Sequence, residues 1–299
     1  MQGPTLDFQP VQLGMRPLVQ GYTRPLGIRN SEYTFTSLLM WGTGDRIRIA
    51  EREDALYILY TFPNHAPFML APLCKRVEDT PRAIAVAAEY LRGIGAKPRF
   101  HGITQDNIRF FEEAGYACTP DRDNFDYVYN MEDLRTLAGK KYHGKRNHIH
   151  QFLARYEYEY IRIEEDTVPE CLAVYEQWLE TKDTGERGVL GEWDAIRMGL
   201  ANLRALELFG GGIRIAGELR AFTLAERIDA EMAVVHFEKA DADVPGLYPL
   251  INREFVEHAL REVRYINREE DMGLAGLRRA KLSYNPAFMV EKYVARPQL

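Results

Sequence analysis

The chain has 299 residues, a formal net charge of −6, 46% hydrophobic residues and 11% aromatic residues. This composition supplies a packed core and excludes a largely disordered chain. No run approaches the ~20 apolar residues of a membrane helix, and residues 1–10 lack the pattern of a secretory signal, so we expect a cytoplasmic protein without a transmembrane segment.

The first half of the chain indicates an arm followed by alternating strands and helices. We expect residues 1–30 to form a docked arm, and the pattern from Thr34 onward is strand-like. Short apolar runs at 57–60 and 68–70 predict an antiparallel meander. The remaining predicted elements are a helix from Pro81 to Gly93, a strand at 99–103, a helix at 105–114, a strand at 125–129 and a connector at 131–139.

The second half repeats this order of elements. They are helices marked by Ile149, Leu172 and Ile196, a strand at 158–163, hairpin strands at 213–215 and 219–225, a strand at 233–237, a helix at 247–255, a strand at 265–267, a basic helix at 274–282 and a strand at 287–293. We interpret the glycines at 210–212 as a helix stop, because no helix follows them as a phosphate-binding turn requires. The pattern predicts an α/β (α+β layered) fold with two domains, 1–135 and 136–299, each with a mixed, mostly antiparallel sheet flanked by helices.

One basic segment stands out in this acidic chain. An acidic protein does not attract polyanions through its overall field, so any contact with nucleic acid must be local. Residues 140–150 contain four Lys or Arg, three His and no acid, and they open a helix, where backbone N–H groups favour an anion. A solvated basic face is the alternative. The histidine spacing does not suit zinc, and we expect no metal site.

Two further segments place charged residues at the ends of apolar strands. His236 and Lys239 end one strand, and residues 267–271 directly follow another. Strand ends are common positions for acid and base groups, although a structural ion-pair network explains them equally well. No GxSxG motif occurs, and the three cysteines are interpreted as buried thiols. These absences favour a substrate that is already activated, which the protein positions while it manages protons.

Five segments together carry a family resemblance. They are Asp121–Tyr129, Gly139–His148, Phe237–Asp241, Ile266–Gly273 and Leu277–Pro286. The chain resembles, from about Tyr33 to Tyr293, stand-alone bacterial proteins similar to the C-terminal catalytic domain of phosphatidylglycerol lysyltransferase. The resemblance implies two tandem GNAT-like (acyl-CoA N-acyltransferase-like) domains, related to Fem-type aminoacyltransferases, with a degenerate first half. It also implies an aminoacyl-tRNA donor and an amine or hydroxyl acceptor on a small molecule, a peptide or a lipid headgroup.

Together with the resemblance, the charged segments predict site residues and no required cofactor. Lys239 is expected to stabilise an oxyanion, and Glu269 or Asp271 to accept a proton from the attacking amine. The expected substrate- or phosphate-binding residues are Lys140, Lys141, Tyr142, His143, Lys145, Arg146, Asn147, His236, Asp241, Asn267, Arg268, Lys281 and Tyr284.

Two alternatives to aminoacyl transfer remain open at this stage. One is an acyl-CoA-dependent N-acetyltransferase, although the usual glycine-rich pyrophosphate loop is missing and residues 243–248 offer one glycine and an acid in its place. The other is a non-enzymatic module that binds a peptide or a nucleotide. The sequence does not identify the transferred group, the acceptor or the oligomeric state.

Overall fold

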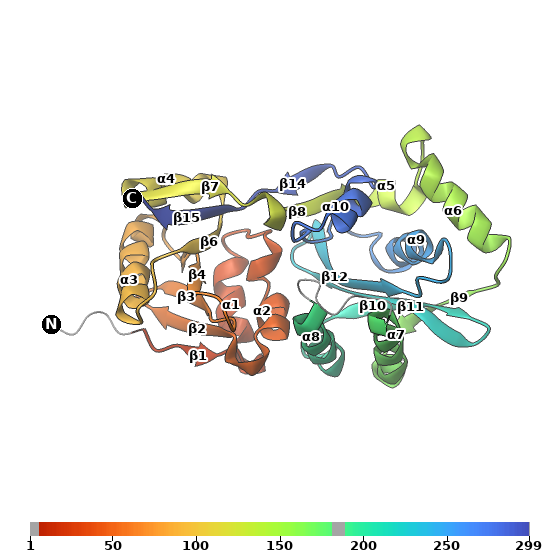
Figure 1. The fold of residues 1–299 in the computed structure, drawn as a ribbon, viewed down its shortest axis with the longest axis horizontal. Coiled ribbons are helices and arrows are strands. Elements are labelled where there is room, and N and C mark those ends of the chain that lie inside the picture. Colours follow the sequence, from red (N-terminus) through yellow and green to blue (C-terminus); the bar gives the residue numbers. More distant parts are fainter. Residues whose placement is uncertain (1–5, 181–188, 299) are drawn as a thin grey trace. The chain divides into compact units, whose positions relative to one another are not determined.

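The computed structural model describes residues 6–180 and 189–298 (Figure 1). Contacts divide the chain into unit 1, Met1–Phe125 with Val290–Leu299, and unit 2, Asp126–Met289. This division differs from the predicted boundary at 135/136. Residues 126–130 pair within the sheet of unit 2, and residues 293–297 return to the sheet of unit 1. Both pairings join residues far apart in the sequence, so local patterns do not reveal them.

Unit 1 contains one mixed sheet with the strand order β1-β2-β3-β4-β6-β15-β7, and β5 also pairs with β3. The strands are β1 Gln9–Pro10, β2 Ile47–Arg52, β3 Ala55–Tyr60, β4 Phe68–Leu70, β5 Leu73–Cys74, β6 Phe100–Ile103, β7 Tyr116–Pro120 and β15 Tyr293–Pro297. The expected antiparallel meander is confirmed by β2, β3 and β4. Strands β4 and β6 run parallel.

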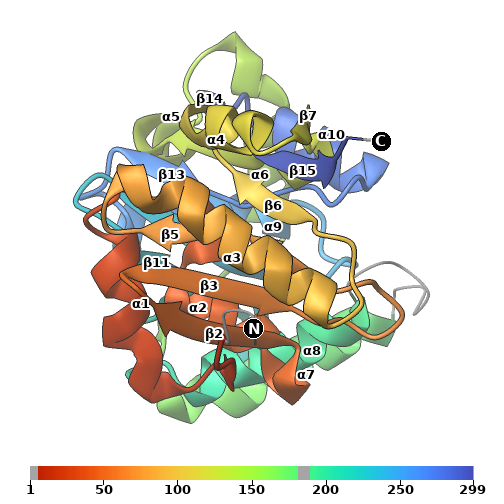
Figure 2. The ribbon, with the colours of Figure 1, turned by 90° about the vertical axis from the view of Figure 1, so that its left-hand side faces the viewer.

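The α-helices that accompany the sheet in the described part of unit 1 are α1 Arg16–Thr23, α2 Phe35–Trp41, α3 Thr80–Gly93 and α4 Ile108–Glu113. Helix α3 crosses one face of the sheet (Figure 2), where Ile84, Ala87 and Leu91 join the buried core. The strand-like interpretation from Thr34 onward is wrong for residues 35–41. The Thr34 side chain accepts a hydrogen bond from the Ser37 N–H at 3.1 Å and so caps α2.

Tyr33 fills the point at which β4 and β6 separate. Its hydroxyl donates to the carbonyl oxygen of Ala71, which follows β4, at 3.0 Å, and lies 3.4 Å from the carbonyl oxygen of Gly102 in β6. Gly102 has φ +65°, and a Cβ there would lie 3.1 Å from the Tyr33 ring. A glycine in β6 therefore makes room for this tyrosine.

Unit 2 contains a second sheet with the strand order β14-β8-β13-β12-β11-β10-β9. The strands are β8 Asp126–Asn130, β9 Glu159–Ile163, β10 Phe209–Ile215, β11 Glu218–Arg227, β12 Met232–Ala240, β13 Tyr265–Asn267 and β14 Phe288–Val290. Strands β12 and β13 run parallel, whereas β9 to β12 form an antiparallel series.

Helices cover both faces of the sheet in unit 2. They are α5 Met131–Thr136, α6 His143–Leu153, α7 Val168–Glu180, α8 Val189–Ala201, α9 Leu247–Ala259 and α10 Ala275–Leu282. Helix α9 lies on one face of β10, β11 and β12, and α7 and α8 lie on the other (Figure 1). The buried core beneath α9 contains Leu250, Ile251 and Phe255 together with Val235 and Ala240 of β12.

Three predicted elements of unit 2 differ from the structure. The connector at 131–139 contains helix α5, and the strand expected at 287–293 is two strands, β14 and β15, in different sheets. The glycines at 210–212 lie inside β10 instead of ending a helix. A Cβ on Gly211 would lie 2.4 Å from the Tyr160 hydroxyl, so the glycine lets the Tyr160 ring pack against β10. The predicted hairpin turn is confirmed at Ala216 and Gly217.

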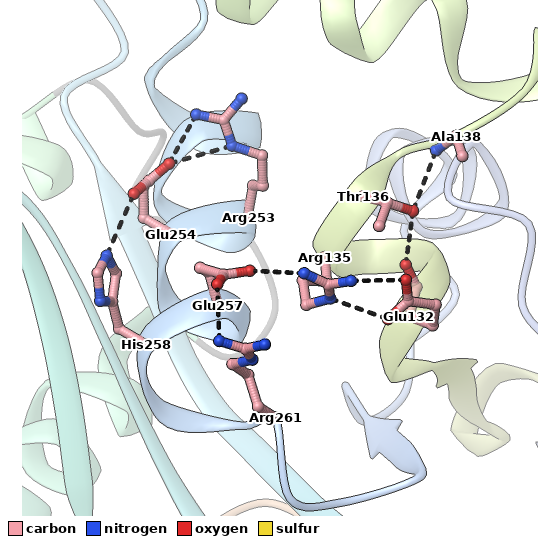
Figure 3. A network of polar contacts seen from close by, with 9 residues as sticks. All are labelled: Glu132, Arg135, Thr136, Ala138, Arg253, Glu254, Glu257, His258 and Arg261. Carbon is pink, nitrogen blue, oxygen red and sulfur yellow. Dashed lines mark hydrogen bonds and ion pairs between the residues drawn. The ribbon is translucent and has the colours of Figure 1, made fainter.

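A polar network joins α5 to α9 (Figure 3). Arg135 of α5 pairs with Glu132 at 2.7 Å on its own helix and with Glu257 of α9 at 3.1 Å. Glu257 also binds Arg261 at 3.3 Å, one turn further along α9. Because α5 directly follows β8, this network ties the start of unit 2 to the helix that covers its sheet.

Candidate active site

The backbone pairing between β12 and β13 stops after three residues. Met232, Ala233 and Val234 pair with Tyr265, Ile266 and Asn267. Beyond this point β12 continues beside β11, while the chain after β13 continues beside β8 through backbone hydrogen bonds between Tyr127 and residues 268–269. We call this divergence of the two strands the strand split.

Side chains bridge the strand split in place of the backbone. His236 Nδ1 of β12 lies 2.8 Å from Glu269 Oε1, and Arg268 donates to Glu238 of β12 at 2.8 Å. His236 occupies a β-bulge, because the register with β11 shifts between Val235 and Phe237. A bulge redirects the side chain of the extra residue, and here it directs the imidazole between two carboxylates.

Consecutive residues of a regular strand point to opposite faces of the sheet, and the bulge at His236 resets this alternation in β12. Ala240 belongs to the core beneath α9, so its neighbour Lys239 faces α7 and α8 and contacts residues of both helices. His236 contacts Glu226, which follows the core residue Ala225 in β11 and therefore also points away from α9. Glu238 faces α9, where it accepts a hydrogen bond from Asn252 at 3.1 Å. The strand split thus presents different groups on its two faces.

On the α7/α8 face, an aromatic and acidic environment surrounds the ammonium group of Lys239. Its Nζ donates to Glu192 of α8 at 2.9 Å and lies 3.7 Å from the centre of the Trp178 ring. The Tyr175 hydroxyl also donates to Glu192, at 2.9 Å. The Lys239 side chain is only 9% exposed, which makes its charge effective toward any group that approaches it.

His236 carries a positive charge on the same face. Its Nε2 lies 3.0 Å from Glu226, and its Nδ1 binds Glu269. Burial opposes the charge, but the hydrogen bonds to Glu226 and Glu269 outweigh it and raise the pKa of His236 to about 10. At neutral pH the ring is therefore an imidazolium that donates to both carboxylates. It orients Glu269 and does not itself accept a proton.

The α9 face holds a cluster of cations and tyrosines. The guanidinium of Arg268 lies 4.9 Å from the centre of the Tyr284 ring and 5.8 Å from that of Tyr129. Lys145 lies 3.9 Å from the Tyr284 ring centre, and Lys281 donates from Nζ to the carbonyl oxygen of Arg268. Of the predicted binding residues, Lys145, Lys281 and Tyr284 thus lie close to Arg268.

Three predicted site residues have structural partners that explain their burial. Asp271 accepts hydrogen bonds from Arg278 at 2.8 Å and from the Gly273 N–H, and these bonds anchor the start of α10. Burial opposes its charge, but its hydrogen bonds to Arg278 and other donors lower the pKa of Asp271 to about 2. Asn267 donates to Asp126 at 3.0 Å, and Asp241 binds Arg220 at 3.0 Å. A carboxylate with a pKa of about 2 is a poor proton acceptor.

Some residues of the basic segment 140–147 hold the local backbone in place, and others are exposed at the surface. Arg146 donates to the carbonyl oxygens of Leu137 and Gly139 and so holds the turn before α6. The buried Tyr142 donates to the carbonyl oxygen of Tyr284 at 2.8 Å. Exposed positions are Lys140, Lys141, His143 and Asn147, of which Lys141 pairs with Asp133 and His143 contacts Asn147.

Several residues of the strand split give no signal in the sequence. Glu226 and Glu238 lie within apolar strands, and Glu192 lies in a helix with no distinguishing motif. Their partners are 10 to 47 positions away in the sequence, so spacing gives no signal for them. The one available signal was Tyr175 and Trp178, two aromatic residues at helical spacing in α7.

Within residues 6–180 and 189–298, no group of three or more His, Cys, Asp or Glu side chains is arranged to hold a metal ion. The same part of the chain contains no helix with the length and apolar character needed to cross a bilayer.

Solved structures share this fold. A conserved protein of unknown function from Bacteroides thetaiotaomicron is 33% identical, with a TM-score of 0.89 over 98% of this chain and 100% of that one. L-PGS from Bacillus licheniformis is 15% identical, with a TM-score of 0.66 over 99% and 94% of the two chains. A tandem GNAT protein from the clavulanic acid biosynthesis pathway is 12% identical, with a TM-score of 0.53 over 99% of both chains. The predicted tandem GNAT-like fold is confirmed.

Family membership follows from the sequence match. None of the curated proteins matches the chain. The family model described as "Phosphatidylglycerol lysyltransferase, C-terminal" matches residues 23–296, which is nearly the whole chain. The chain therefore belongs to this family and is a transferase of the acyl or aminoacyl class.

Proposed function

We propose that the protein transfers an aminoacyl group from aminoacyl-tRNA to an amine or hydroxyl acceptor. The observation that carries the proposal is the common position of Lys239, His236 and Glu269 on the α7/α8 face of the strand split. Attack on an activated ester requires a cation to stabilise the oxyanion and a carboxylate to accept the proton, and this face supplies both groups. The acceptor belongs to a small molecule, a peptide or a lipid headgroup, and we expect the reaction in the cytoplasm.

The reaction needs no protein nucleophile, because the donor ester is already activated. The acceptor nitrogen or oxygen forms a bond to the ester carbonyl carbon, and Lys239 stabilises the oxyanion that develops. Glu269, held by His236, accepts the proton of the acceptor. The bond to the tRNA 3′ oxygen then breaks, and that oxygen takes up the proton.

The start of α9 argues against the acyl-CoA alternative. The Asp243 N–H binds the side chain of Asp241 at 2.9 Å, and the Leu247 N–H binds the carbonyl oxygen of Val244 at 3.3 Å. A Cβ on Gly246 would lie 2.3 Å from the His148 carbonyl oxygen, so α6 packs closely on this turn. Donors that a pyrophosphate would use are therefore occupied, and two carboxylates stand beside them.

The exposed part of the basic segment offers positive charge for the phosphates of an aminoacyl-tRNA donor. Lys140 and Lys141 are exposed on the turn before α6. Exposed lysines bind phosphates of a nucleic acid backbone without sequence preference, and such binding weakens as salt concentration rises. We therefore assign tRNA contacts to these lysines and not to Arg146, which holds the turn.

The proposal is tested by incubating the protein at low salt with a panel of radiolabelled aminoacyl-tRNAs and a mixture of amine and hydroxyl acceptors. We expect acceptor-dependent loss of label from one or a few tRNAs. A parallel thermal-shift series with acetyl-CoA should give no stabilisation, whereas a ligand at 100 times its Kd stabilises by about 2.7 kcal/mol. Stabilisation by acetyl-CoA with no consumption of any aminoacyl-tRNA contradicts the proposal.

Two variants test the assigned residues once a donor is known. Lys239→Met is expected to lower kcat by about 100- to 1,000-fold, as removal of an oxyanion donor does. Glu269→Gln retains a side-chain oxygen for His236 but removes the base, and it is expected to lower kcat by about 100-fold or more. Lys97→Met, at an exposed position in unit 1, is the control and should leave kcat unchanged. Wild-type rates in both site variants contradict the assignment.

A further inference from the structure

The α9 face of the strand split contains a cationic group that the proposed transfer reaction does not use. Arg268 is 13% exposed and pairs with Glu238, which is 10% exposed. Its second terminal nitrogen, Nη1, is buried and makes no hydrogen bond to any residue that the structure describes. A buried guanidinium N–H without an acceptor is costly, so this group is suited to an acceptor supplied by a ligand.

Two further lysines, Lys145 and Lys281, lie near Arg268, and carboxylates accompany them. Lys145 lies on the ring of Tyr284, and burial together with the charge of Arg268 lowers the pKa of Lys145 to about 8. Burial is likewise the main cause that lowers the pKa of Lys281 to about 8. The charged and titratable groups that face these two lysines are Arg268, Glu238 and Tyr284 around Lys145, and Glu270, Arg268, Glu269 and Asp126 around Lys281.

We propose that Arg268, Lys145 and Lys281 form a binding site for one compact phosphate group of a small ligand. The planar guanidinium supplies directed donors, and the two lysines supply point charge for the remaining oxygens. Tyr284, which is 5% exposed, forms an apolar wall that Lys145 and Arg268 both contact. A phosphate placed here accepts a hydrogen bond from Arg268 Nη1.

Burial favours a small ligand over the backbone of an RNA. The phosphates of a polynucleotide lie in a row at a surface, and the exposed Lys140 and Lys141 suit them. Arg268 and Tyr284 are covered, so a single terminal or headgroup phosphate fits them better than a chain of phosphates. The test of this site is independent of the proposed transfer reaction, because anion binding is measured without a donor or an acceptor.

The test is calorimetric titration of the whole protein with inorganic phosphate, glycerol 3-phosphate and sulfate, against sodium chloride of equal ionic strength. We expect saturable binding of all three oxyanions. Lys145→Met should weaken their binding about tenfold, the effect of losing one charge-assisted contact. Lys97→Met, at an exposed position in unit 1, should leave it unchanged. Arg268→Gln should abolish binding, and if that variant does not fold, the comparison of Lys145→Met with Lys97→Met still tests the proposal.

Three results overturn the proposal. One is the absence of saturable binding above the chloride control. Another is equal weakening by Lys145→Met and Lys97→Met, which indicates only diffuse attraction at the surface. The third is displacement of sulfate by an unphosphorylated CCA oligonucleotide but not by glycerol 3-phosphate, which indicates that the site takes the internal phosphates of RNA.

Proton uptake gives a readout that nonspecific attraction does not reproduce. A bound anion raises the pKa of Lys145 and Lys281 above about 8, so binding near pH 8.5 takes up protons from the buffer. Sulfate does not titrate in this range, so titrations in buffers of different ionisation enthalpy report the protein alone. We expect uptake at pH 8.5 that disappears at pH 6, where both lysines are already charged. Proton-neutral binding at pH 8.5 contradicts the assignment of these lysines.

Discussion

The hydroxyl of Tyr33 lies 3.0 Å from the carbonyl oxygen of Ala71, and this one side chain closes the separation of β4 and β6 in unit 1. The corresponding separation of β12 and β13 in unit 2 is bridged by the ionisable residues His236, Glu238, Arg268 and Glu269. A phenol with a pKa raised by burial offers no charge for substrate chemistry. We propose on this basis that unit 1 supports the fold and contains no transfer site.

Gly102→Ala should destabilise the protein by about 1 to 3 kcal/mol, because φ is +65° and the new Cβ would lie 3.1 Å from the Tyr33 ring. Tyr33→Phe should cost about 1 to 2 kcal/mol through the lost hydrogen bond to a buried carbonyl group. Both values are measured by urea unfolding. If the two substitutions leave the unfolding midpoint unchanged, the tyrosine does not brace these strands.

The pKa of about 10 for His236 predicts a stability that depends on pH. The folded state binds this proton more tightly than the unfolded state, with its ordinary pKa of about 6.5. The stabilisation is therefore complete below pH 6.5 and is lost as pH rises through 10. Over this range the wild-type protein should lose about 4 kcal/mol relative to His236→Gln. Ring ¹⁵N chemical shifts at pH 8 check the charge directly, and a neutral ring there contradicts the prediction.

Asp271→Asn separates the anchoring role of this carboxylate from the catalytic role that the sequence predicted. The change breaks the pair with Arg278, which is 32% exposed, and should destabilise the protein by about 2 to 3 kcal/mol. The lowered pKa of Asp271 means that its stabilisation is present above pH 4 and is lost as pH falls toward 2. At a temperature where the variant is folded, transfer activity should stay within about threefold of wild type. A loss of transfer activity above 100-fold in a folded Asp271→Asn variant contradicts this prediction and indicates that Asp271 is catalytic.

Gly211→Ala should destabilise unit 2 by about 1 to 3 kcal/mol, because the added methyl group meets the Tyr160 ring and hydroxyl. Gly144→Ala is the matched control. Its position in α6 has no atom within 4 Å of the new Cβ, so alanine should stabilise the protein by about 0.5 to 1 kcal/mol. Thermal unfolding of the two variants measures the difference, and equal midpoints contradict the close packing of Tyr160.

Local patterns in the sequence predicted most elements but not their partners. Pro81 and the apolar spacing after it correctly predicted α3, whereas the strand-like interpretation from Thr34 onward included residues where a side-chain cap begins α2. Propensity is a weak signal against such a cap and the packing of a helix on a sheet.

In the candidate site too, local patterns in the sequence predicted residues but not their partners. The sequence predicted Lys145, Arg268 and Lys239 as site residues without indicating which face of the sheet each one occupies. Lys145 and Arg268 lie together, and Lys239 lies apart from them. The sheet separates them, because Lys239 and Glu238 are neighbours in one strand and point to opposite faces. Glu192 could not have been identified, since only the packing of α8 on β12 brings it to Lys239. Chain patterns identify charged residues at strand ends, whereas the partner of each charge depends on long-range packing.

The position of β15 has a consequence for the order in which the protein is made. This strand pairs with both β6 and β7, although residues 126–289 of unit 2 separate it from them in the sequence. On the ribosome, the first 125 residues therefore emerge long before the strand that completes their sheet. Until β15 is synthesised, the edges of β6 and β7 that bind it remain unpaired. Unit 2 is built from one continuous segment that ends at Met289, shortly before β15 begins at Tyr293. The unit that is translated first is thus completed by the strand that is translated last.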